Sequence, residues 1–162
     1  MELNMFGPIN SLGYGVVFRN LVLAASEKID VSLNPVYGDF HPETNIEAEK
    51  FEFILKKEIF DINSPSMLVW HQGETQIFAG KPRIALPIFE LTEFTSREKI
   101  MLNQVDYLAV MSHWGKEVML NNGVSIPDKI FVIPGGIDPT IFHTNHPINQ
   151  NYVMPDTFTF FS

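Results

Sequence analysis

Residues Val105–Phe142 read VDYLAVMSHWGKEVMLNNGVSIPDKIFVIPGGIDPTIF. This stretch predicts a strand over 106–111, a helix over 112–122 and a second strand over 129–133. The second strand leads into the turn Gly135-Gly136-Ile137-Asp138. One strand–helix–strand unit thus brings two glycines and an acid to the carboxyl end of a strand. In open α/β sheets, ligands bind at that end.

Outside this unit, the chain alternates between short apolar runs and helical patterns. Further strands are predicted at 2–6, 29–36, 67–70 and 83–88, and further helices at 16–28, 46–60 and 95–103. Most of these strands are continuous apolar runs, which is typical of parallel strands buried on both faces. Strands that alternate with helices form βαβ units. The expected fold class is therefore α/β, a Rossmann-like doubly wound parallel sheet with helices on both faces.

Two of the predicted helices carry apolar residues at helical spacing. These are Val17, Leu21, Ala24 and Ala25 in the first helix, and Phe51, Leu55 and Ile59 in the second. We expect both apolar faces to pack on the sheet.

The composition narrows the classes of function. The chain has 162 residues, enough for one domain with a full core. It lacks cysteine, which excludes disulfides and cysteine-based metal sites. Its net charge of −8 argues against binding to nucleic acid or to anionic lipid. Because no signal-peptide pattern and no apolar run of about 18 residues is visible, a cytoplasmic protein without a transmembrane segment is expected.

A glycine pair lies between the first predicted strand and the first predicted helix, as Gly13-Tyr14-Gly15. Such glycines let a ligand approach the backbone, and the helix end favours an anion. The other interpretation is a turn that needs positive φ. An NAD-binding motif is excluded because Phe18 replaces its third glycine, while Asp30 begins the second strand and only Asn34 lies near its end.

Four polar residues follow predicted strands at the edge where ligands bind. His71 is either structural or catalytic. Glu90 is either a carboxylate that accepts a proton from a hydroxyl or an acid at the start of a helix. Ser112 is placed to cap the next helix, and Asp138 before a proline favours an Asx turn. The histidines show no metal-ligand spacing, so no metal site is expected.

Taken in order, these motifs resemble the N-terminal domain of a GT-B-fold glycosyltransferase of the retaining, family 4 ("group 1") type. The resemblance covers nearly the whole chain. It is carried by Gly13-Tyr14-Gly15, by Asp106–Ser112 with Gly123-Val124, and by Val132–Asp138 with Phe142. The last of these resembles the family's Ile-Pro-Asn-Gly-Val/Ile-Asp…Phe motif and is the most specific match.

The resemblance implies one half of a GT-B fold that transfers a hexose from a nucleotide-sugar, the co-substrate, to a hydroxyl of a carbohydrate or other acceptor. Configuration at the anomeric carbon is retained, and neither a cofactor nor a metal is needed. The implied roles are catalysis by Glu90, contact with the donor diphosphate and acceptor by Gly13, Tyr14 and Gly15, and lining of the cleft by His71, Ser112, Gly136 and Asp138.

The sequence departs from the family in two places and contains one accidental match. Gly135 replaces the usual asparagine, and Phe89-Glu90 stands where many members carry a histidine, so a histidine-based role does not transfer. The spacing of Glu90 and Glu98 matches the family's E-x7-E motif. We interpret this match as a coincidence, because the motif belongs to the donor-binding C-terminal domain.

The expected organisation is an acceptor-binding domain at 1–145, a linker at 146–156 and the start of a C-terminal donor-binding domain at 157–162. The chain then resembles a fragment cut at a domain boundary or the acceptor half of a split enzyme. It is expected to be inactive without its missing C-terminal domain or a partner chain. The alternative is a standalone Rossmann-like module that binds carbohydrate or a partner without catalysis.

Overall fold

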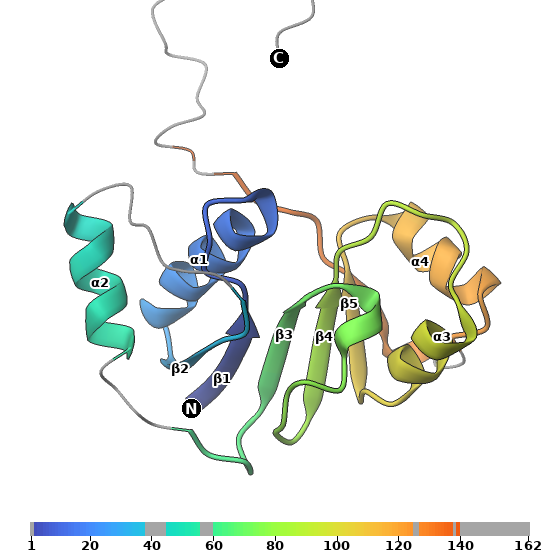
Figure 1. The fold of residues 1–162 in the computed structure, drawn as a ribbon, viewed down its shortest axis with the longest axis horizontal. Coiled ribbons are helices and arrows are strands. Elements are labelled where there is room, and N and C mark those ends of the chain that lie inside the picture. The colour runs from blue at the N-terminus through green and yellow to red at the C-terminus, as the bar shows by residue number, and fades with distance from the viewer. Residues whose placement is uncertain (1, 38–44, 56–59, 125–126, 138, 140–162) are drawn as a thin grey trace, which may run out of the picture.

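The computed structural model describes residues 2–37, 45–55, 60–124, 127–137 and 139. Within them lies a six-stranded, all-parallel sheet with the strand order β2-β1-β3-β4-β5-β6 (Figure 1). The strands are β1 (Glu2–Gly7), β2 (Asp30–Pro35), β3 (Ser66–Trp70), β4 (Arg83–Pro87), β5 (Tyr107–Val110) and β6 (Ile130–Val132). The predicted α/β class is confirmed.

The helices lie between successive strands. They are α1 (Gly13–Ser26), α2 (Asn45–Leu55), α3 (Ser96–Asn103) and α4 (His113–Asn121), with two 3-10 turns, η1 (Gln72–Glu74) and η2 (Pro127–Lys129). The predicted cap at Ser112 is confirmed, and α3 is capped in the same way by Thr95. The Thr95 hydroxyl accepts from the backbone N–H of Glu98, and the Ser112 hydroxyl accepts from that of Gly115.

Two apolar cores occupy the opposite faces of the sheet. Neighbouring residues of one strand belong to different cores: Leu68 to one and Val69 to the other, and likewise Leu108 and Ala109. This alternation follows from the period of two in a strand, and it explains why β3, β4 and β5 carry consecutive apolar residues. The first core is completed by residues of α3 and α4, and the second by residues of α1 and α2.

The predicted α1 face packs against the core through Val17, Leu21 and Ala25, but the most deeply buried helix residues are not all the predicted ones. On α1, Phe18 and Val22 are fully buried, whereas Val17 and Leu21 are only half-buried. On α2, the buried residue that follows Phe51 is Ile54, three positions on. The predicted residue, Leu55, lies four positions on and is 39% exposed. The expected third member of that face, Ile59, lies outside the described residues.

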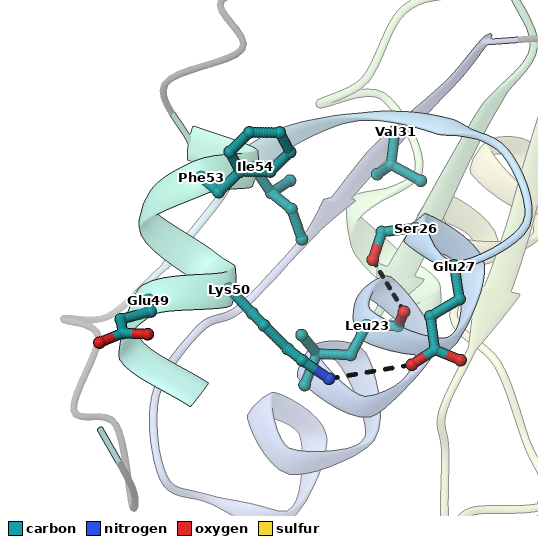
Figure 2. A pocket seen from close by; sticks show the side chains of 8 residues that line it. All are labelled: Leu23, Ser26, Glu27, Val31, Glu49, Lys50, Phe53 and Ile54. Carbon is teal, nitrogen blue, oxygen red and sulfur yellow. Dashed lines mark hydrogen bonds and ion pairs between the residues drawn. The ribbon is translucent and has the colours of Figure 1, made fainter. Parts of the chain in front are cut away.

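A groove of about 330 Å³ runs between the end of α1 and α2. Figure 2 shows the Lys50 side chain reaching from α2 toward Glu27, which follows α1. Their charged atoms are 3.8 Å apart, but both side chains are more than half exposed. A solvated pair of this kind stabilises a protein by less than about 1 kcal/mol, so apolar packing holds α2 against α1.

Among the residues that the structure describes, no helix is both long and apolar enough to cross a membrane. The predicted linker at 146–156 and the predicted strand at 157–162 lie outside those residues.

Candidate functional site

The strand order identifies where a ligand-binding crevice is expected. From β1 the chain crosses first to β2 on one side and later to β3 on the other. Such a reversal is a topological switch point, and open α/β sheets bind ligands outside the carboxyl ends of the strands there. In Figure 1 these ends point upward, toward the loops that enter α1 and α4.

Four rings gather at the switch point, and we call them the switch-point ring cluster: Tyr14, Tyr37, Trp70 and His71. The ring centroids of Tyr14 and His71 are 4.9 Å apart, and those of Tyr14 and Trp70 are 5.7 Å apart. Tyr37 lies 5.1 Å from Trp70, which itself lies 4.5 Å from His71. Tyr37 is 47% exposed and the other three rings are half-buried, so the cluster forms an open aromatic surface.

The four rings come from three places in the fold, because His71 directly follows Trp70. Trp70 is the last residue of β3, and its carbonyl accepts from the N–H of Ile88, which fixes it beside β4. Tyr37 follows β2, where its carbonyl accepts from the N–H of Ile9 in the loop after β1. Tyr14 stands in the first turn of α1. The loops after β1, β2 and β3 therefore converge on one surface.

The two glycines beside Tyr14 have different roles. A Cβ at Gly15 would overlap the carbonyl oxygen of Asn10 and lie 2.5 Å from that residue's Oδ1, whereas a Cβ at Gly13 would meet no atom within 4 Å. Positive φ, the other sequence interpretation, is wrong here. Among described residues it occurs only at Gly80 and Gly123. Gly15 thus lets the loop after β1 lie against α1, and Gly13 leaves the helix start accessible.

The first turn of α1 also has no side-chain cap. Its N-cap residue, Leu12, makes no capping hydrogen bond and is 68% exposed. The Asn10 side chain accepts instead from the N–H of Leu12, one residue before the helix. The N–H groups of the first helical turn carry a partial positive charge that favours an anion.

A second group of predicted residues lies over β4 and β5. Ser112 caps α4 and lines a cavity of about 130 Å³ together with Phe89 and Trp114. Glu90 directly follows Phe89 and is exposed. The sequence motifs pointed to Ser112 and Glu90 but missed the two aromatic residues, which are separated by 25 positions and meet only through the pairing of β4 with β5.

Gly136 belongs to a cavity whose lining includes none of the four rings of the switch-point ring cluster. This apolar cavity of about 500 Å³ lies between α1 and the segment 133–137, with Val17 and Leu21 on the opposite wall. The apolar face predicted for α1 therefore borders this cavity as well as the core, against which Val17 and Leu21 also pack. Neither Gly135 nor Gly136 has positive φ. Asp138 lies outside the described residues.

Glu98 has a structural role, which agrees with the interpretation of E-x7-E as a coincidence. Its carboxylate accepts from the backbone N–H and hydroxyl of Thr95 at 2.7 and 2.8 Å, and from the Gln72 side-chain amide at 2.7 Å. Burial of the carboxyl opposes ionisation, but these hydrogen bonds together outweigh it, so the pKa of Glu98 is lowered. The carboxylate ties α3 to η1.

The lowered pKa of Glu98 predicts an acid-sensitive contribution to stability. A carboxyl whose pKa is depressed by folding stabilises the protein above its unfolded pKa, and the contribution is lost as pH falls through the folded pKa. Glu98→Gln should therefore cost up to about 1 kcal/mol of unfolding free energy at pH 7, and less at pH 3. Urea denaturation at both pH values checks this, and an equal cost at both would contradict it.

The described residues contain no group of three or more His, Asp or Glu side chains arranged to hold a metal ion. Comparison of the chain with models of protein families, with curated proteins and with solved structures finds no match. The residues at the carboxyl edge of the sheet are therefore the ones that point to a function.

Proposed function

We propose that the chain is the acceptor-binding half of a retaining glycosyltransferase, which transfers a hexose from a nucleotide-sugar to a hydroxyl group. The observation that carries the proposal is the switch-point ring cluster. It presents an exposed aromatic surface at the position where an open parallel sheet binds its ligand.

The chemistry of the cluster suits a sugar. A pyranose ring has an apolar face of C–H groups and an edge of hydroxyls. Tyr and Trp side chains combine an apolar ring with one polar group, so they can pack against the face and bond to the edge. The phenols of Tyr14 and Tyr37 and the imidazole of His71 supply donors and acceptors around the Trp70 ring.

The donor diphosphate and the acceptor hydroxyl are assigned to groups beside the switch-point ring cluster. The uncapped first turn of α1 beside Gly13 favours the leaving diphosphate. As the acceptor oxygen bonds to the anomeric carbon, the bond from that carbon to the donor phosphate breaks. Glu90, by resemblance, orients the acceptor hydroxyl or takes its proton. Most donor contacts would come from a C-terminal domain or a partner chain.

Titration of the chain with methyl α-D-hexopyranosides, followed by amide chemical shifts in NMR spectra, tests the proposal. Saturable shifts should appear at Gly13–Gly15 and at Trp70-His71, with dissociation constants of about 1–10 mM for a single sugar ring. If no pyranoside moved these signals, or if the shifts occurred only at the amino edge of the sheet, the proposed acceptor site would be wrong.

A matched pair of tyrosine variants sharpens this test. Tyr37→Ala removes a 47% exposed ring of the cluster and should weaken pyranoside binding roughly three- to tenfold, because an aromatic contact contributes about 0.5–1.5 kcal/mol. Tyr107→Ala removes a 37% exposed ring from the first residue of β5, at the amino edge, and should leave affinity unchanged. Equal affinities for both variants would contradict the assignment.

The alternative function, a binding module without catalysis, predicts the same shifts but a different native polypeptide. Intact mass spectrometry of the protein captured from its source with an antibody separates the two. A mass roughly twice that of this chain fits an added donor domain of similar size. A mass that matches 162 residues favours the binding module or a two-chain enzyme.

A further inference from the structure

A second aromatic surface lies at the carboxyl edge, over β4 and β5, and is separate in sequence from the switch-point ring cluster. Phe89 follows β4, and its ring centroid lies 5.1 Å from that of Phe94 and 5.8 Å from that of Trp114 in α4. Trp114 remains 47% exposed despite this contact. We call Phe89 and Trp114 the Trp114 shelf.

The shelf borders a small cavity. Its volume is about 130 Å³, and its walls come from the ends of β4 and β5 and the start of α4. Met111 and Ile88 add apolar surface beside the two rings. A space of this size, with aromatic walls on one side, suits part of one small ring and not a large polycyclic ligand.

The polar groups around the cavity are few and carry no positive charge. The hydroxyl oxygen of Ser112 accepts from the N–H of Gly115 at 3.1 Å, and a hydroxyl has further capacity to bond a ligand. None of the described residues that line the cavity is Lys or Arg. The nearby Lys116 donates its ammonium to the carbonyl of Ile130. The described lining therefore carries no formal positive charge to pair with a phosphate, and its aromatic and hydroxyl groups suit a neutral ligand.

We propose that the Trp114 shelf binds a pyranose ring, with one apolar face of the sugar on the exposed indole and a hydroxyl directed to Ser112. The inference rests on the proposed function and extends it, because it places a second sugar unit of the acceptor over β4 and β5, beside Glu90. An acceptor of at least two sugar units would then contact both aromatic surfaces of the carboxyl edge.

The chain offers a direct way to observe each surface by itself, since its two tryptophans are divided between them. In Trp70→Phe, fluorescence reports on the Trp114 shelf alone, and in Trp114→Phe it reports on the switch-point ring cluster alone. Each variant is titrated with methyl α-D-glucopyranoside, mannopyranoside and galactopyranoside. Sorbitol is the control, because it has the hydroxyls of a hexose but no ring face. Adenosine tests whether a planar nucleobase binds to the same surface.

The expected result is a saturable change of Trp114 emission with at least one pyranoside and none with sorbitol. In NMR titrations, Trp114→Ala should raise the dissociation constant reported by the Gly115 amide roughly tenfold, the scale of one stacked ring. Trp114→Phe should raise it less. Circular dichroism checks that both variants are folded, which is expected because Trp114 is half exposed.

The outcomes separate this inference from the proposed function. A response from Trp70 without one from Trp114 would overturn the shelf and leave the proposed function standing. A response from Trp114 alone would support the shelf and overturn the site assigned to the switch-point ring cluster. If the emission of Trp114 changed with adenosine but with no pyranoside, the Trp114 shelf would be wrong as a sugar site. If the emission of neither tryptophan changed with any pyranoside, both proposals would be overturned.

Discussion

Replacement of Gly15 by alanine is expected to lower the free energy of unfolding by about 2–3 kcal/mol, the scale of an overpacked site. The added Cβ would overlap the carbonyl oxygen of Asn10 and lie 2.5 Å from its side-chain oxygen. Relief requires the loop after β1 to move away from α1. Because Tyr14 precedes Gly15 and Ile9 in that loop bonds to Tyr37, the same movement should disturb the switch-point ring cluster.

Gly13→Ala is the matched control for this prediction. Position 13 also lies in the first turn of α1, but a Cβ there would meet no atom within 4 Å. Alanine is favoured over glycine in a helix, so the change should be neutral or stabilise by up to about 1 kcal/mol. Urea denaturation followed by circular dichroism measures both variants. Equal stabilities would show that the loop after β1 does not depend on the close approach at Gly15.

Under the proposed function, the largest effect on activity is expected from Glu90→Gln in the native protein captured from its source. Loss of a general base or of a carboxylate that orients the acceptor lowers turnover by about 10²–10⁴-fold. The free energy of unfolding should be unchanged, because Glu90 is exposed and glutamine has nearly the same size and shape as glutamate. Sugar transfer measured at saturating acceptor, with a denaturation midpoint for each variant, checks both statements.

Glu93→Gln provides the control for Glu90. Glu93 is also an exposed acid, three residues further along the same loop, and no role is assigned to it. Its replacement should leave both turnover and stability as they are. An unchanged rate in Glu90→Gln would remove that carboxylate from the mechanism, and an equal loss in both variants would point to a general effect of negative charge near the cleft.

The fold was predictable because parallel strands leave a strong pattern. Continuous apolar runs such as Met67–Trp70 and Tyr107–Val110 allow few positions for a strand, and Ser112 indicated where a helix begins. The helix faces were harder to predict. Spacing alone selected Leu55 over Ile54, whereas contact with α1 and the sheet decides which of the two is buried.

The site was only partly predictable, for a related reason. Glycines and acids at strand ends could be identified one by one, but the switch-point ring cluster joins residues that follow three different strands. Tyr37 and Trp70 are 33 positions apart, and only the arrangement of β2, β1 and β3 brings their rings within 5.1 Å. Aromatic residues at strand ends are a signal that would have identified Trp70 and Phe89 as candidates.

The anomeric configuration of the product tests the central claim most directly. The native protein, captured from its source, would be supplied with a panel of nucleotide-sugars and saccharide acceptors, and the product linkage read by NMR. The account predicts transfer of one hexose with the donor's anomeric configuration kept, and its loss in Glu90→Gln. Transfer with inversion, or no transfer from any donor, would contradict the assignment of this chain as the acceptor half of a retaining glycosyltransferase.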